Sequence, residues 1–190
     1  MKSEIIFLLD RSGSMETGKS DYIGGFNQFL GEQKQVAGDC RVTFIQFDDS
    51  YEKVFDGALR DMPPLTNASF KPRGRTALYD ALCRMIDDVG ARLSATPAAE
   101  RPDKVIVVIL TDGAENASLR YTLDEASERI RHQRDAYQWE FVFLAANQDA
   151  FAVGRLLHID AANTQGFVAE SQSIGQTYST ASGLVRNFRR

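Results

Sequence analysis

Cysteine and histidine are scarce in this sequence of 190 residues, which contains two of each. Cys40 and Cys83 form no CxxC pair, and two thiols cannot cross-link a scaffold of this size. His132 and His158 stand alone, with no second histidine or cysteine at the spacing of metal ligands. The sequence therefore argues against a disulfide-rich fold, a thiolate or histidine zinc site, and a Ser-His-Asp catalytic arrangement.

Long apolar segments and an excess of basic residues are also absent. The longest apolar run falls far below the roughly 20 residues that span a bilayer, so we expect no membrane insertion. Met1 to Glu4 lead directly into a short apolar segment without the pattern of a signal peptide, which predicts a cytoplasmic protein. A formal net charge of −4 and a pI of about 5.3 give no reason to expect nucleic acid as a partner.

The apolar runs predict the strands of a central sheet. Three almost continuously apolar segments have the pattern of parallel strands that are buried on both faces: residues 5–9, 105–110 and 141–145. Residues 41–47 and 51–55 flank Asp48-Asp49-Ser50, which predicts a hairpin and hence one antiparallel edge strand. A sixth strand is expected near residues 158–161.

Helical patterns alternate with these strands. Apolar residues at helical spacing, or helix-capping residues, predict helices over about 23–37, 77–93, 122–137, 149–157 and 174–188. Thr122 and Glu125 have the spacing of a capping box at the start of the third helix. We therefore predict a single domain over residues 1–190, with a doubly wound, mostly parallel α/β sheet, one antiparallel edge strand and helices on both faces.

Two acidic residues stand where predicted strands end. Asp10 ends the first strand and is followed by Ser12 and Ser14, and Asp112 follows the strongest central strand. Ligands of open parallel sheets bind at the carboxyl ends of the strands, beside the switch in strand order. Carboxylate and hydroxyl oxygens suit a hard cation such as Mg²⁺, and the absence of soft ligands nearby argues against zinc or copper. Taken singly, each of these residues is by default a turn or capping residue.

Together, these segments resemble the metal-ion-dependent adhesion site of von Willebrand factor A-type (vWA) domains. The resemblance rests on Asp10-x-Ser12-x-Ser14, on Thr76 within Gly74-Arg75-Thr76-Ala77-Leu78-Tyr79-Asp80, and on Thr111-Asp112-Gly113. It covers nearly the whole chain and implies a Rossmann-like vWA fold with a metal bound by Asp10, Ser12, Ser14, Thr76 and Asp112. The implied ion is Mg²⁺, with Mn²⁺ or Ca²⁺ as alternatives. Capping of the helix that starts after it is a competing role for Thr76, and the two roles can coexist.

The resemblance also implies a function in binding proteins. A metal held mostly by neutral oxygens favours an acidic side chain of a partner at an open coordination position. Stand-alone members suggest an AAA-type ATPase or a stress-system component as partner, and adhesive members suggest that the last helix can move. Arg11, Arg75 and Glu115 neighbour the proposed ligands and are expected to contact the partner, although Arg11 and Arg75 could also be plain solvated charges. The family often has glycine at the position of Arg75.

Two other functions use the same metal. A Mg²⁺-dependent hydrolase or phosphoryl-transfer enzyme would need a nucleophile or general base beside the ion. No lysine stands near the proposed metal loops, and no G-x-x-x-x-G-K-[ST] sequence is present, so we expect a protein that is not an enzyme. In a metal-stabilised scaffold, the ion would only relieve repulsion between Asp10 and Asp112.

Overall fold

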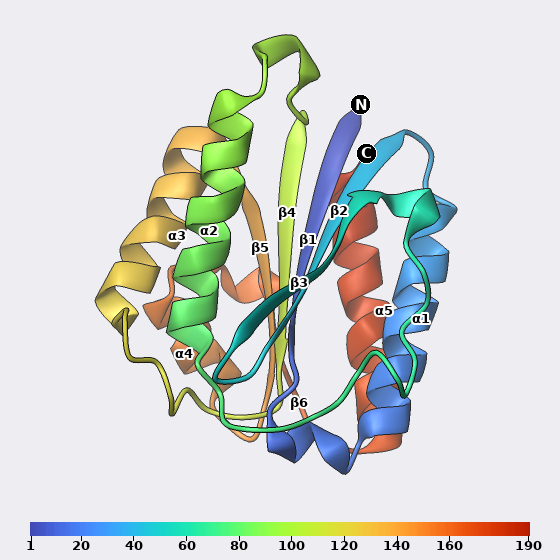
Figure 1. Cartoon of the computed structure of the whole chain (residues 1–190), viewed down its shortest axis with the longest axis vertical. Coiled ribbons are helices and arrows are strands. Elements are labelled where there is room, and N and C mark those ends of the chain that lie inside the picture. The colour runs from blue at the N-terminus through green and yellow to red at the C-terminus, as the bar shows by residue number, and fades with distance from the viewer.

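The computed structural model describes residues 1–190 and contains one six-stranded sheet with the strand order β3-β2-β1-β4-β5-β6 (Figure 1). Its strands are β1 (Lys2–Asp10), β2 (Asp39–Phe47), β3 (Tyr51–Ala58), β4 (Lys104–Thr111), β5 (Glu140–Ala146) and β6 (Thr164–Phe167). Its helices are α1 (Lys19–Lys34), α2 (Leu78–Ala95), α3 (Leu123–Tyr137), α4 (Ala150–Leu156) and α5 (Ser171–Phe188). Only the β2–β3 pair is antiparallel, so the predicted fold class, with its antiparallel edge strand, is confirmed.

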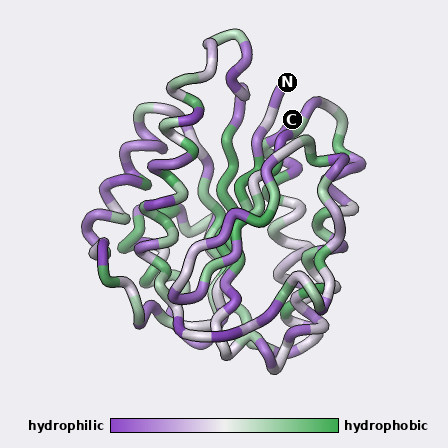
Figure 2. Tube along the Cα trace, viewed as in Figure 1, coloured by the Kyte–Doolittle hydropathy of each residue, from purple (hydrophilic) through white to green (hydrophobic).

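Helices cover both faces of the sheet because its central strands are apolar on both sides. Ile5, Phe7 and Leu9 pack in one apolar cluster with α1 and α5, whereas Ile6 and Leu8 pack in a second cluster with α2, α3 and α4. Successive strand residues point to opposite faces, so a continuous apolar run requires cover on each. Figure 2 shows this as hydrophobic central strands between helices with mixed hydropathy.

Local sequence signals account for the helix starts. Thr122 and Glu125 form the predicted capping box of α3, in which each side chain accepts from the other residue's backbone N–H. Asp149 caps α4 by accepting from the backbone N–H of Ala152 at 3.0 Å. Both predicted caps are confirmed. None of the helices combines the length and apolar character needed to cross a membrane.

The predicted sixth strand was misplaced. Residues 158–161 follow α4 and lead into a 3-10 turn, and the strand instead lies at Thr164–Phe167. His158 has a φ of 56°, a left-handed conformation that ends a helix and does not continue as a strand. β6 contains Gln165 and Gly166, so it has no apolar run that a sequence pattern could detect.

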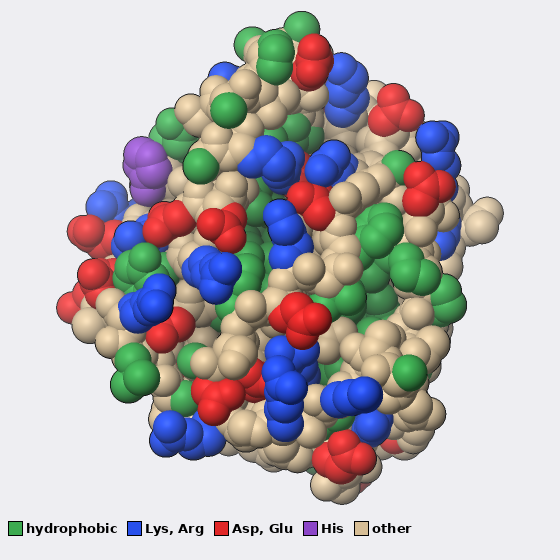
Figure 3. Space-filling model, in the orientation of Figure 1, with side chains coloured by type: hydrophobic (Ala, Val, Ile, Leu, Met, Phe, Trp, Pro, Cys, Tyr) green, Lys and Arg blue, Asp and Glu red, His purple; other side chains and the backbone are tan.

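Charges of both signs share the outer surface. In Figure 3, acidic and basic side chains are interspersed over the face on which β3 lies. This mixture agrees with the modest net charge of −4. No single sign of charge therefore dominates this face.

Candidate metal centre

The five predicted metal ligands lie at one end of the sheet, where β1 and β4 end side by side. Leu9 pairs with Leu110 in the parallel β1–β4 ladder, so Asp10 and Thr111, the last residues of these two strands, lie side by side. From β1 the chain proceeds to β2 and β3 on one side, and β4, β5 and β6 extend the sheet on the other. The site therefore occupies the switch in strand order, which is at the lower end of the molecule in Figure 1.

The hydroxyl groups converge beside Asp112. Ser12 Oγ lies 3.1 Å from Ser14 Oγ, and Ser14 Oγ donates to Asp112 Oδ1 at 2.5 Å. A Cβ added to Gly113 would lie 3.7 Å from Thr76 Oγ1 and 3.8 Å from Ser14 Oγ, so the Thr76 hydroxyl reaches the same place. Ser14 is exposed, whereas Ser12, Thr76 and Asp112 are buried. The group thus opens to solvent on the side of Ser14.

Thr76 does not cap α2, so the predicted capping role is wrong. The N-cap residue is Ala77, which forms no side-chain cap hydrogen bond. Only the backbone groups of Thr76 are engaged: its N–H donates to Asn116 Oδ1 at 2.9 Å, and its carbonyl accepts from the N–H of Asn116 at 3.0 Å. The hydroxyl is therefore left available to a ligand.

Asp10 is fully buried and anchors the loop that follows it. Its Oδ1 accepts from the N–H of Ser12 at 2.6 Å, and its Oδ2 accepts from Thr111 Oγ1 at 2.7 Å. Burial raises the pKa of Asp10 to about 6; the nearby charge of Asp112 adds to this, and the hydrogen bonds from Thr111 and Ser12 oppose it. Burial also raises the pKa of Asp112. Two such carboxylates in one buried place favour a bound cation.

The donor set, which consists of carboxylate and hydroxyl oxygens, fits a hard cation. Adjacent oxygens of an octahedron with metal–oxygen distances of 2.0–2.1 Å lie about 2.9 Å apart, against about 3.3–3.7 Å for the 2.3–2.6 Å distances of Ca²⁺. The 3.1 Å separation of the Ser12 and Ser14 hydroxyls lies between these values, so it is compatible with either size of ion. No group of three or more histidine, cysteine or acidic residues is arranged to hold a metal ion by itself. A cation here would therefore be held by three hydroxyls and two carboxylates.

The three residues expected to contact a partner differ in their exposure and in their contacts. Arg75 is exposed and forms no ion pair, as that expectation requires. Arg11 is only 6% exposed, and its guanidinium is used internally by Asp48 and Glu52. The prediction of Arg11 as a solvated charge is therefore wrong, and its contact with a partner stays a prediction.

Glu115 also serves the protein itself. Its Oε1 accepts from the N–H groups of Ala117 and Ser118, and its Oε2 accepts from the N–H of Tyr79 and the hydroxyl of Ser118. This carboxylate folds the loop after β4 and fixes it to the first turn of α2. The prediction that Glu115 contacts a partner is therefore not supported.

Several residues that shape the site were not found from the sequence. Asn147 Nδ2 donates to the carbonyl of Asp112 at 2.6 Å, and Gln148 Nε2 donates to the carbonyl of Gly113 at 3.0 Å. Asn147 has a φ of 57°, which asparagine tolerates better than most residues. Two amide side chains directly after the buried strand β5 were the available signal. They fix the backbone that carries Asp112.

Comparison with known proteins finds similarity at the level of structure. No family model and no curated protein sequence matches this chain. Among solved structures, it is similar to the PilB minor pilin from Streptococcus sanguinis, with 11% identity and a TM-score of 0.69 over 98% of this chain and 61% of the pilin. It is similar to the vWF domain of the type V pili tip protein Mfa5 from Porphyromonas gingivalis, with 10% identity and a TM-score of 0.69 over 100% and 97% of the two chains.

A third similar structure is proximal thread matrix protein 1 from the mussel byssus, described with a zinc-occupied adhesion-site motif. It shares 16% identity with this chain, with a TM-score of 0.67 over 98% of this chain and 48% of the matrix protein. This chain thus spans about half of that protein and 61% of the pilin. These similarities show that the fold is vWA-like.

Proposed function

We propose that this chain is a metal-dependent protein-binding module. Asp10, Ser12, Ser14, Thr76 and Asp112 would hold one divalent cation, and the cation would bind an acidic side chain of a partner protein. In this proposal residues 1–190 act as one domain, since both apolar clusters pack against the same sheet. The vWA-like fold of pilus proteins such as the Mfa5 domain is consistent with a role in protein interaction.

One observation carries the proposal: three hydroxyls from two separate loops gather around a buried carboxylate. Ser12 and Ser14 come from the end of β1, and Thr76 comes from the loop before α2. Three of the five proposed ligands are neutral hydroxyl oxygens, so a carboxylate supplied from outside is a favourable further ligand of the cation. The exposure of Ser14 leaves room for it.

The cation in this proposal is Mg²⁺, with Mn²⁺ as a close substitute and Ca²⁺ as a less favoured one. The compact, hydroxyl-rich donor set supports the smaller ions. Because the byssus protein is described with zinc in its adhesion-site motif, Zn²⁺ belongs in the same titration. Arg75, exposed beside Thr76, would steer or pair with the acidic partner.

The direct test is calorimetric titration of the purified chain with Mg²⁺, Mn²⁺, Ca²⁺ and Zn²⁺. Asp112→Ala should abolish binding of the preferred ion, whereas Asp149→Ala should leave it unchanged, because Asp149 only caps α4 at the same end of the sheet. Equal ion binding by Asp112→Ala and the unaltered chain would refute the site.

The protein-binding part needs a second experiment. Partners captured by the unaltered chain in Mg²⁺ buffer should be lost with EDTA and with Asp112→Ala. An AAA-type ATPase or a stress-system component among them would agree with the partner class expected from the sequence. A partner that binds equally well in EDTA would show that the metal does not bridge the complex.

We infer binding in place of catalysis, and a cytoplasmic location. Turnover of phosphoester substrates by the metal-loaded protein that disappears in Asp10→Asn would support the alternative, a Mg²⁺-dependent hydrolase or phosphoryl-transfer enzyme. Fractionation of cells with an antibody against the chain tests the location.

A further inference from the structure

A buried carboxylate that is not a proposed ligand lies behind the metal centre. Asp48 follows β2 and is fully buried. Its Oδ2 accepts from Arg11 Nε and from Arg73 Nε, both at 2.9 Å, and its Oδ1 accepts from the N–H of Ser50 at 2.6 Å. A single acidic side chain therefore binds two arginines that come from different segments of the chain.

Both arginines belong to the loops that supply the metal ligands. Arg11 stands between Asp10 and Ser12, and Arg73 lies three residues before Thr76. The backbone repeats the connection, because the N–H of Arg73 donates to the carbonyl of Arg11 at 2.8 Å. The carboxylate of Asp48 thus bridges the two loops on the side away from the ligands.

The backbone of Asp48 adds a third connection. Its carbonyl accepts from the N–H of Ala77 at 3.0 Å, directly after Thr76. Gly74 has a φ of 65°, and a Cβ there would approach Asp49 Oδ1 to 2.8 Å, so the loop is pressed closely against the β2–β3 turn. The carbonyl of Gly74 in turn accepts from the N–H of Gly13 at 3.2 Å.

The charges around Asp48 keep it ionised. Burial alone would raise its pKa, but hydrogen bonds from Arg73 and Ser50 and the charge of Arg11 outweigh burial and lower it. Glu52 supplies a second carboxylate to Arg11 at 2.5 Å. An ionised Asp48 is therefore present at neutral pH to hold both arginines.

We propose that Asp48 is a positioning residue of the metal centre, which holds the loop carrying Thr76 against the loop carrying Ser12 and Ser14. Outer groups that orient metal ligands commonly change metal affinity when they are removed. The inference rests on the proposed function, since it assigns a role toward the same metal.

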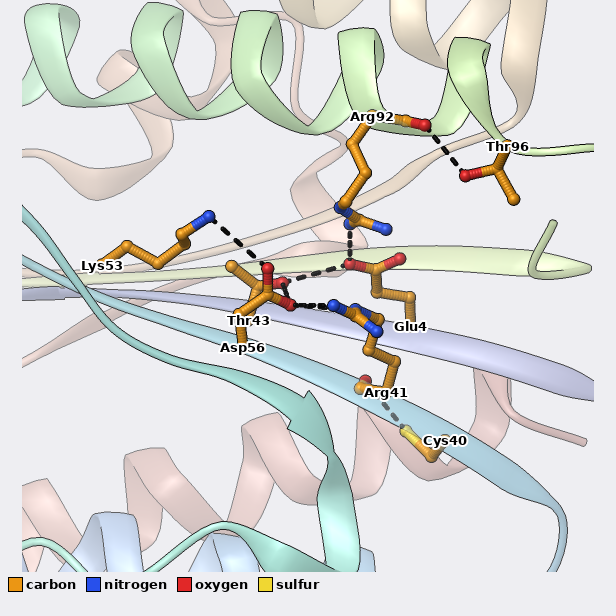
Figure 4. A network of polar contacts seen from close by, with 8 residues as sticks. All are labelled: Glu4, Cys40, Arg41, Thr43, Lys53, Asp56, Arg92 and Thr96. Atoms are coloured by element: carbon orange, nitrogen blue, oxygen red, sulfur yellow. Dashed lines mark hydrogen bonds and ion pairs between the residues drawn. The ribbon is translucent and has the colours of Figure 1, made fainter. Parts of the chain in front are cut away.

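Asp56 provides a matched control on the same β2–β3 hairpin. It also binds two cations, with Arg41 Nε at 2.8 Å and Lys53 Nζ at 3.5 Å, and it accepts from Thr43 Oγ1 at 3.2 Å. Figure 4 shows this group, which lies near Glu4 and away from the ends of β1 and β4. Asp56→Asn removes a comparable charge pair without touching the metal loops.

The experiment compares Asp48→Asn, Asp56→Asn and Asp112→Ala in titrations with Mn²⁺, together with water-proton relaxation of the bound Mn²⁺. We expect Asp48→Asn to weaken Mn²⁺ binding by about 10–100-fold and to raise the number of metal-bound waters, as Thr76 is released. Asp56→Asn should change neither. If Asp112→Ala abolishes binding while Asp48→Asn binds Mn²⁺ normally, the inference fails and the proposed function stands.

A second measurement does not depend on the metal. Trypsin can cleave after Arg73 and Arg75, within the loop that Asp48 is proposed to hold. In EDTA, Asp48→Asn should be cut faster at these two bonds than Asp56→Asn or the unaltered chain. Equal cleavage rates would overturn the inference even if no variant binds Mn²⁺. Should Asp48→Asn fail to fold, Arg73→Gln takes its place, because the Arg73 side chain is 61% exposed. Since this variant lacks the cleavage site after residue 73, its cleavage is compared at the bond after Arg75 alone.

Discussion

The two ends of the sheet bury acidic groups in different ways. At the amino end, Glu4 is 1% exposed and is bound by Arg92 and by Thr43 Oγ1, so its charge is balanced within the chain. At the carboxyl end, Asp10 and Asp112 accept only from hydroxyls and backbone N–H groups. Both have raised pKa values, in which burial is the largest cause. The amino end thus pairs its buried carboxylate with an arginine, whereas the buried carboxylates at the carboxyl end are suited to bind a metal cation.

The ion pairs of the amino end serve stability, whereas the proposed function lies at the carboxyl end. Figure 4 shows Arg92 reaching from α2 to Glu4, and Arg41 reaching Asp56 across β2 and β3. These pairs cover sheet surface beside α2, and one oxygen of Glu4 still has no partner. At the carboxyl end the arginines bind Asp48, which is not a proposed ligand, and leave Asp10 and Asp112 without a positive partner.

The largest effect is expected from Asp10→Asn, which removes the unfavourable buried charge at the carboxyl end of the sheet. The amide can still accept from the N–H of Ser12, and Thr111 can turn its hydroxyl to the carbonyl of Gly113, 2.9 Å away. We expect metal binding to be lost and the metal-free protein to gain up to about 3 kcal/mol, since one pKa unit corresponds to about 1.4 kcal/mol. Urea unfolding in EDTA measures the gain. A destabilised variant would contradict the idea that the buried charge of Asp10 is unfavourable without metal.

At the amino end, the corresponding change is Arg92→Ala, which leaves the Glu4 carboxylate buried and unpaired. Removing one partner of a buried pair costs about 3 kcal/mol at the lower end of the usual range, which applies because the Arg92 side chain is 30% exposed. Urea unfolding should show this loss, while calorimetry with Mg²⁺ should show an unchanged affinity. A change in metal affinity would mean that the two ends are coupled and that the comparison fails.

The pH dependence of stability should differ in sign between the ends. The pKa of Asp56 is lowered: burial alone would raise it, but Arg41, Arg92 and Lys53 outweigh burial. The stabilisation from its ionised form is therefore present above its ordinary value of 3.8 and is lost as the pH falls through the lower folded value. Asp10 in EDTA behaves oppositely: its penalty is full above about pH 6 and disappears as the pH falls to 3.8. Unfolding curves of Asp56→Asn, Asp10→Asn and the unaltered chain, measured from above pH 6 to below pH 3.8, follow both trends.

The smallest effect is expected from Gly113→Ala. The added Cβ would make ordinary contacts at 3.7 and 3.8 Å with Thr76 Oγ1 and Ser14 Oγ, so stability should change by no more than about 0.5 kcal/mol. The methyl group would nevertheless occupy space beside two proposed ligands and should weaken Mg²⁺ binding. Gly90→Ala is the control, since a Cβ there meets nothing within 4 Å. Equal Mg²⁺ affinity in both variants would place the metal elsewhere.

The sequence was sufficient for the fold and for which residues converge, because both depend on where apolar runs end. Asp10 and Asp112 were placed together by the ends of β1 and β4, and the structure brings Ser12, Ser14 and Thr76 to the same place. That these residues bind metal stays a prediction. β6 was misplaced because its four residues carry no apolar periodicity.

The surroundings of the site were harder to predict, because chain neighbours need not share a face. Arg11 directly follows Asp10, but side chains of consecutive extended residues point in opposite directions, and Arg11 turns to Asp48. That partner lies 37 residues away, and no local pattern indicates it. Glu115 was similarly judged by its nearness to Asp112 in the sequence, whereas its acceptor oxygens are used by nearby backbone groups and by Tyr79.

The pairing of β1 with β4 also determines when the site can form. Ser14 and Asp112 are 98 residues apart, and Asp10 and Thr111 are 101 residues apart. Contacts of such long sequence separation are slow to form, since closure of the intervening chain must come first. If the site forms only after the sheet has assembled, a cation bound there would mainly slow unfolding and would do little to speed folding. The ion would then stabilise the sheet only after it has assembled, and removing the ion would shorten the lifetime of the folded state.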